Sequence, residues 1–159
     1  DRKSVYVAAL MGRRIHVFDR EVDTGELSPA GVIKVSTNPD NVEVDEQGTL
    51  WIGAHPKLVS LVRHVVFGSD PIPMELGGSQ FLDPASLAPS QVVRILKQPE
   101  GGYQLKQVYV NDGDEISASS VAARLKGRLL IGSLTDAHIL DCDFDPFPTR
   151  NFRDDIREN

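Results

Sequence analysis

Short apolar runs and alternating apolar–polar runs, separated by turn residues, fill most of the 159-residue chain. These runs are rich in Val, Ile and Leu, and they are shorter than most helices, so they predict β-strands. Leu58–Val66 is the best candidate for a helix, although its apolar residues fit both helical and strand spacing. The predicted strands include residues 5–10, 15–18, 31–35, 50–55, 91–96, 105–110 and 129–134.

Three of these strands repeat one pattern, in which apolar or aromatic residues are followed by a small pair and an exit residue. They begin at Val5, Leu50 and Leu129, and the spacings of 45 and 79 residues correspond to about one and two units of ~40. Asn41 lies nine positions before the second run, as Ser120 lies nine positions before the third. A blade-length repeat of short strands favours a β-propeller over a sandwich or a closed barrel.

The strands suffice for about three blades, whereas closed propellers typically have four to eight. Three blades leave unpaired strand edges at both ends of the stack. We therefore expect an all-β chain that forms about three blades of a larger β-propeller. Its partners would be N-terminal blades outside this chain or a second copy of the chain.

The propeller part is expected to span residues 1–143. Residues 68–90, rich in Gly, Pro and Ser, predict a long loop inserted into a blade, and residues 144–159 predict a charged tail. The sequence NDGDEIS at 111–117 lacks the twelve-residue spacing and closing Glu of an EF-hand, so it predicts an acidic turn into the last blade.

The amino-acid composition and the net charge argue against some classes of function. The formal net charge is −6 and no run of Lys or Arg occurs, which disfavours a nucleic-acid or anionic-membrane surface. No apolar stretch is long enough to span a bilayer, and the first residues read as a charged turn before a strand, not as a signal peptide. The single cysteine, Cys142, excludes an intrachain disulfide. It is either a small buried apolar residue in a reducing compartment or one half of a pair with another chain.

Several segments together resemble the serum paraoxonase/arylesterase family. They include VYVAALMGRRIHVFDR, PDNVEVDEQGTLWIGAHP and SSVAARLKGRLLIG, and the resemblance covers residues 1 to about 143. It implies a six-bladed propeller with Ca²⁺ in its central tunnel that hydrolyses lactones and aryl esters, a carboxylic ester hydrolase. It also implies that this chain is the C-terminal part. The family's N-terminal ligands and histidine dyad have no counterpart here, so we expect the isolated chain to be inactive.

By this resemblance, Asp40 and Asn41 match the family's paired calcium ligands. Ca²⁺ takes about six to eight oxygen ligands from carboxylates, amide carbonyls and water, and a carboxylate beside an amide supplies two of them. The start of the inner strand of a blade faces the tunnel, so neighbouring blades can converge on one ion. The alternative is an Asp-Asn turn after Pro39 with no ligand.

His55, in GAHP, matches a histidine that lines the family's active site, and either substrate contact or proton shuttling is expected of it; the alternative is a structural histidine.

Cys142 matches a family cysteine that is disulfide-bonded to one near the N-terminus, which would place the complete protein in a secretory compartment. Without that bond a cytoplasmic location is expected. Four residues match positions at the mouth of the family's pocket, with core packing as the alternative for each: Leu10, Met11, Ser120 and Leu134.

A second class of function stays open, because a fold does not determine a function. A propeller of this kind can be a non-catalytic scaffold or binding module. A hydrolase of sugar lactones is a third possibility that only substrate profiling separates. The chain contains no G-x-S-x-G sequence, so a serine nucleophile of that type is not expected.

Overall fold

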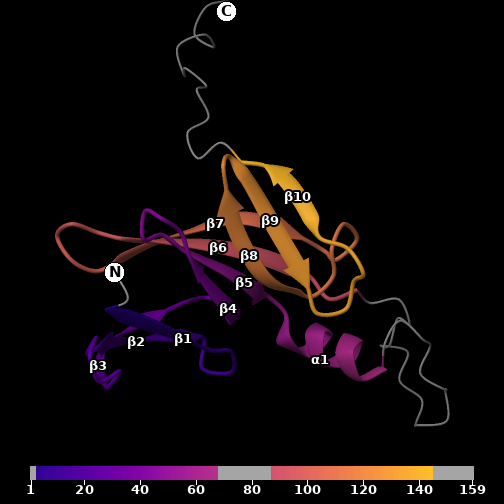
Figure 1. The fold of residues 1–159 in the computed structure, drawn as a ribbon. Coiled ribbons are helices and arrows are strands. Elements are labelled where there is room, and N and C mark those ends of the chain that lie inside the picture. Colours follow the sequence, from indigo (N-terminus) through magenta and orange to yellow (C-terminus); the bar gives the residue numbers. More distant parts are fainter. Residues whose placement is uncertain (1–2, 68–86, 145–159) are drawn as a thin grey trace, which may run out of the picture.

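The protein's structure, a computed structural model, describes residues 3–67 and 87–144, which form three antiparallel sheets and one helix (Figure 1). The first sheet has the order β1-β2-β3, with β1 at Ser4–Ala9, β2 at Arg14–Arg20 and β3 at Leu27–Lys34. The middle sheet has the order β4-β5-β6-β7, with β4 at Asn38–Val44, β5 at Leu50–His55, β6 at Ser90–Lys97 and β7 at Tyr103–Asn111. The last sheet has the order β10-β9-β8, with β8 at Ser119–Leu125, β9 at Arg128–Ser133 and β10 at Leu140–Asp143.

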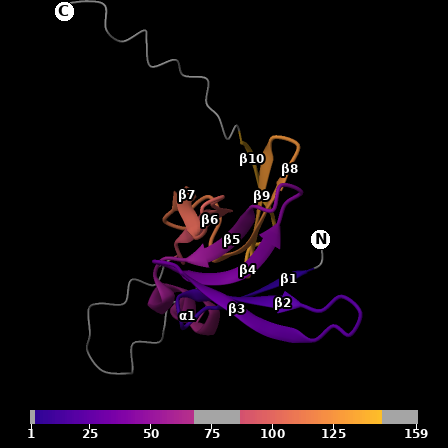
Figure 2. The same cartoon turned by 90° about the vertical axis from the view of Figure 1, so that its left-hand side faces the viewer.

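The three sheets follow one another as adjacent blades of a β-propeller, and the middle sheet lies between the other two (Figures 1 and 2). Inner strand β4 contacts both β1 and β8. The described residues do not close a ring. The predicted all-β class and the partial propeller are therefore confirmed. The predicted helix is also present, as α1 at Leu58–Phe67, directly after β5.

The sequence repeat has a structural counterpart. β5 and β9 carry the repeated pattern, and each is the second strand of its sheet, beside an inner strand. β1 carries the same pattern but forms the edge of its sheet, with no strand on the inner side among the described residues. β1 thus occupies the second-strand position of a blade whose inner position is open in the part of the chain that the structure describes.

Two apolar cores hold the blades together. Ile15 and Ile33 of the first sheet pack with Leu50, Ile52 and further residues of the middle sheet. On the other face of the middle sheet, a second core contains Trp51, Val92, Ile116, Ala122, Leu129 and Ile131. All six residues of β5 are buried, because both faces of this strand are covered by neighbouring blades.

The inner strands β4 and β8 each contain an extra residue. β4 pairs Pro39 with Ala54 and Val42 with Ile52, so Asp40 and Asn41 share one opposing residue, Gly53. β8 shows the same irregularity around Ser120, opposite the β9 segment that contains Gly132. Such bulges bend a strand and change the direction of its side chains. The bulges therefore fall at Asn41 and Ser120, the positions that the repeat had matched.

Gly53 lies where the backbone of the last blade passes directly against the middle blade. A Cβ atom built on it would lie 2.4 Å from the backbone carbon of Ser120 and 2.4 Å from the backbone nitrogen of Val121. Real Cβ atoms do not approach backbone atoms this closely, so only glycine fits here without a shift of β8.

Parts of the predicted insertion and tail, residues 68–86 and 145–159, lie outside the described residues. At the end of the predicted insertion, residues 88–90 are buried and Ser90 already belongs to β6. The acidic segment 111–117 forms no strand beyond Asn111, and it connects β7 to β8 as predicted. No helix in the described part of the chain is long and apolar enough to cross a membrane.

We expect Gly53→Ala to lower the free energy of unfolding by about 2 kcal/mol or more, because the new methyl group meets backbone and not a movable side chain. For a chain of this length that corresponds to a decrease in melting temperature of roughly 4–8 °C. Thermal unfolding followed by circular dichroism measures the change. Gly31→Ala in β3 is the matched control, since nothing lies within 4 Å of its added Cβ. Equal melting temperatures for the two variants would show that the close approach is not a constraint.

Candidate functional site

The residues singled out from the sequence gather at one end of the three sheets. β1, β5 and β9 end on the side of the molecule where α1 lies (Figure 1). The antiparallel partners of β5 and β9, the inner strands β4 and β8, begin at this same end. The structure therefore brings the candidate ligands and the candidate histidine into neighbouring positions, although they come from different strands.

Asp40 and His55 form a pair. The Asp40 Oδ2 and His55 Nε2 atoms lie 3.4 Å apart, and the imidazole is buried while the carboxylate is partly exposed. Burial lowers the pKa of His55, and the neighbouring Asp40 carboxylate opposes that effect, leaving the pKa below its ordinary value. The neutral imidazole can donate its Nε2 proton to Asp40 and thereby fix the direction of the carboxylate.

Asn41 connects the middle blade to the last one. Its Nδ2 donates a hydrogen bond of 3.1 Å to the backbone carbonyl of Ser120. The Asn41 amide oxygen has no described partner, and the residue is exposed. Since the side-chain nitrogen is engaged, the oxygen is the atom left for a ligand. The Ser120 residue itself is buried, and its contribution to this contact is a backbone atom.

The donor chemistry at this end suits a hard cation, but the number of donors is small. Asp40 offers a carboxylate and Asn41 an amide oxygen, side by side on the bulge of β4. Ca²⁺ takes about six to eight oxygens. Within the described ranges, no group of three or more His, Cys, Asp and Glu side chains is placed to hold a metal ion. The residues present therefore fit part of a calcium shell and would need oxygens from elsewhere to complete it.

The predicted pocket residues lie at the same end with different exposure. Met11, in the turn after β1, is 77% exposed, and Leu134, directly after β9, is 53% exposed. Leu10 is half-buried. Met11 and Leu134 are thus not core residues, which leaves their apolar side chains available to a ligand at this end.

Two residues at the site were not singled out from the sequence. Asn38 is buried directly opposite His55 in the β4–β5 pair, and its Nδ2 donates to the Leu10 carbonyl at 2.9 Å. Gly53 makes room for the Ser120 backbone that accepts from Asn41. The repeat contains a signal for Gly53, because Gly132 occupies the equivalent position in β9. The signal for Asn38 is weak, since a polar residue at a strand start is common.

Cys142 is a free, half-buried thiol on β10. Burial raises the pKa of the Cys142 thiol, and the negative charge of Glu115 raises it further. A raised pKa leaves less reactive thiolate at neutral pH. Its predicted disulfide with another segment stays a prediction.

Comparison with known proteins adds to this geometry. The Arylesterase family model matches residues 1–144. The chain belongs to the arylesterase family. The match covers all three sheets, including both inner-strand bulges and the strand ends that carry Asp40 and His55. The predicted resemblance is thereby confirmed.

The similar proteins are paraoxonases. Serum paraoxonase/arylesterase 1 of Homo sapiens is 31% identical over 135 residues, which is 84% of this chain and 33% of that protein. Serum paraoxonase/arylesterase 2 of Homo sapiens is 30% identical over the same shares, and serum paraoxonase/lactonase 3 of Oryctolagus cuniculus is 29% identical. The chain spans about a third of the length of the curated relatives it matches.

We expect the imidazole of His55 to titrate below pH 6.5, because burial disfavours its charged form. The unfolded chain then binds this proton more readily, so the associated stability is complete above about pH 6.5 and is lost as pH falls toward the native pKa. Nuclear magnetic resonance of the imidazole measures the midpoint. Asp40→Asn should lower it further, whereas Asp112→Asn, which removes an exposed acid with no contact to His55, should leave it unchanged. A midpoint that Asp40→Asn does not move would contradict the pairing.

Proposed function

We propose that the protein containing this chain is a calcium-dependent hydrolase of aryl esters and lactones. Family membership supports hydrolysis of esters or lactones, since the similar proteins are named paraoxonase, arylesterase and lactonase. The single observation that carries the proposal is the side-by-side carboxylate and amide at the bulge of β4, with His55 against the carboxylate. The alternative, a non-catalytic scaffold, gives no reason for a buried imidazole beside a half-exposed acid.

Asp40 and Asn41 would hold the Ca²⁺ ion through their free oxygens. Bound calcium would supply a Lewis acid for the carbonyl group of the substrate. The part of His55 is to orient Asp40: the imidazole is fully buried, and Asp40 is its only described hydrogen-bond partner. Asn41 is oriented by its hydrogen bond to Ser120, so the geometry of the ligand pair depends on the contact between two blades.

The exposed apolar side chains of Met11 and Leu134 would contact the non-reacting part of the substrate. Both lie at the end of the sheets where the inner strand β4 begins, the end that carries Asp40 and Asn41. Apolar side chains at this position favour lipophilic esters and lactones over sugar lactones. Hydrolysis rates for an aliphatic lactone and for a sugar lactone of equal ring size would separate these two substrate classes.

Further blades would complete both the site and the fold. The inner edge of β1 has no described partner strand, and an unpaired edge favours pairing with another strand. We propose that blades outside this chain, and not a second copy, cover this edge. Light scattering of the isolated chain tests the choice: a discrete dimer would favour a second copy, whereas aggregation or an unfolded monomer would favour dependence on other blades.

Hydrolysis of phenyl acetate and of an aliphatic lactone by the protein containing this chain tests the activity. We expect removal of calcium by a chelator to abolish turnover and added Ca²⁺ to restore it. Asp40→Ala and Asn41→Ala should each lower kcat/KM by about 100-fold or more, because a hard cation loses one of its few protein oxygens. Asp19→Ala, an exposed acid of β2, is the control. Full activity in the presence of chelator would overturn the calcium proposal.

The role of His55 has its own test. We expect His55→Gln to lower turnover at least about tenfold and to weaken the affinity for Ca²⁺, because the amide supports the Asp40 carboxylate less well than the imidazole does. The melting temperature of the calcium-free protein separates this role from a purely structural one. The structural role would be favoured if His55→Gln lowered the free energy of unfolding by as much as it raised the activation free energy, while the affinity for Ca²⁺ stayed unchanged.

A further inference from the structure

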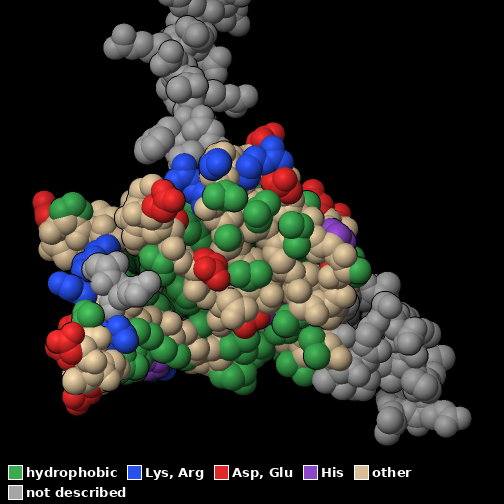
Figure 3. All heavy atoms as spheres, viewed as in Figure 1, with side chains coloured by type: hydrophobic (Ala, Val, Ile, Leu, Met, Phe, Trp, Pro, Cys, Tyr) green, Lys and Arg blue, Asp and Glu red, His purple; other side chains and the backbone are tan. Residues whose placement is uncertain are grey.

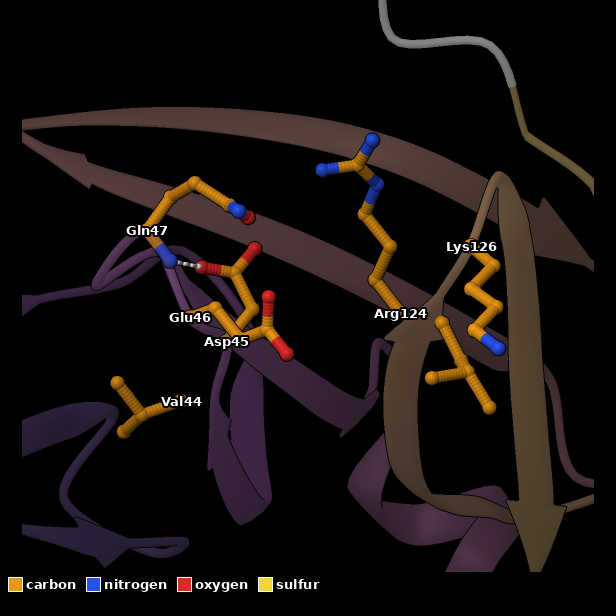
Figure 4. A pocket seen from close by; sticks show the side chains of 7 residues that line it. Val44, Asp45, Glu46, Gln47, Arg124 and Lys126 are labelled. Atoms are coloured by element: carbon orange, nitrogen blue, oxygen red, sulfur yellow. Dashed lines mark hydrogen bonds between the residues drawn. The ribbon is translucent and has the colours of Figure 1, made fainter.

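A groove lies at the end of the sheets opposite Asp40 and His55. Its walls are the β4–β5 turn of the middle blade and the β8–β9 turn of the last blade (Figure 4). β4 runs from Asn38 to Val44, so the groove lies about 13 Å along the strand from Asp40. The cavity has a volume of about 440 Å³, a size that suits a small molecule.

One wall carries bases without an acid partner. Arg124 at the end of β8 has a buried Nε atom that no described acceptor contacts, and Lys126 in the following turn has no described ion pair. Arg128, nearby on β9, differs: it is paired with Asp141 and Asp143 (2.8 Å and 2.5 Å). Basic side chains gather at this end of the last sheet in the space-filling view (Figure 3). Arg124 and Lys126 are thus the two bases of this hairpin without a described acid partner.

The other wall carries an acid that is already satisfied. The carboxylate of Asp45 accepts hydrogen bonds from the backbone nitrogens of Gln47 (3.0 Å) and Thr49 (2.9 Å) and from Trp51 Nε1 (2.9 Å). These donors stabilise the charge of the carboxylate and hold it in the turn. In Figure 4 the Arg124 guanidinium points toward the wall that carries Asp45 and Glu46, with no hydrogen bond drawn between the two walls, whereas the Lys126 side chain points in another direction. Glu46 is the acid that stays available, since its side chain has no described partner.

Apolar surface accompanies these charges. Val44 is 51% exposed and Leu125 is 57% exposed, and both line the groove. A ligand matched to the groove therefore has one carboxylate for Arg124, an apolar body for Val44 and Leu125, and a hydroxyl donor for Glu46. The Arg124 guanidinium can bind a carboxylate through two parallel hydrogen bonds. Glu46 repels a second negative charge, which disfavours dianions.

We propose that this groove binds an aliphatic hydroxycarboxylate with a single negative charge. Hydroxycarboxylates are the class of compound that opening a lactone releases, so the ligand would be a reaction product. The assignment as product rests on the proposed function, whereas the binding site does not.

The probe for this site is 6-hydroxyhexanoate, titrated into the protein containing this chain and followed by backbone amide chemical shifts. We expect saturable shifts at residues 45–48 and 124–128. 1,6-Hexanediol lacks the carboxylate and should produce none, and inorganic phosphate should bind at least about tenfold more weakly. Equal binding of phosphate, or shifts with the diol, would overturn the proposal.

Variants locate the contact. Arg124→Gln should weaken binding of 6-hydroxyhexanoate by about tenfold or more, because the charged hydrogen-bond donor is lost. Arg128→Gln removes the same charge from the same hairpin and should change affinity less than about twofold. Glu46→Gln should reduce the discrimination against phosphate. Equal effects of Arg124→Gln and Arg128→Gln would show a general effect of charge and no site.

The two proposals can fail separately. Binding at residues 45–48 and 124–128 in a protein without lactone hydrolysis would retain the site and remove its role as a product site. Lactone hydrolysis in a protein that does not bind 6-hydroxyhexanoate at the groove would retain the activity and overturn this inference.

Discussion

The close contact between the middle and last blades at Gly53 is the constraint on which the rest of the structure depends. At this point the backbone of β8 passes over β5 with no room for a side chain. The contact brings the Ser120 carbonyl within hydrogen-bond distance of Asn41, and it closes the second apolar core around Trp51. A side chain at position 53 would separate the blades, and the core and the candidate site would be affected together.

The bulges explain how a regular sheet presents polar groups at its end. In an ideal pleat, Asp40 and Asn41 would point to opposite faces. The extra residue in β4 changes that alternation, and Pro39 is tolerated because β4 is an edge strand of its sheet. The same device recurs at Ser120 in β8, although there the side chain is buried and the backbone carbonyl makes the contact.

The polar side chains at the two opposite ends of the inner strands have different hydrogen-bonding surroundings. At one end the polar atoms are oriented by contacts between blades and keep oxygens available. At the other end Asp45 is saturated by its own turn, and the bases of the neighbouring hairpin have no described acid partner. Acidic residues at the two ends therefore differ in their availability to a ligand, because they accept different numbers of hydrogen bonds from neighbouring groups.

Much of the fold was determined by the sequence alone. The spacing of apolar residues predicted most of the strands, and the repeat predicted blades with equivalent positions at Asn41 and Ser120. The same spacing made the segment after β5 the best helix candidate but fitted a strand as well, and the structure decided for the helix. These features are local, or they recur along the chain, so a single sequence contains them. The pairing of His55 with Asp40, the exposure of Met11 and Leu134, and the approach of β8 to Gly53 were decided only by the tertiary structure. Each depends on how two strands or two blades pack, and hydrophobic periodicity carries no information on distances between elements that are far apart in the chain.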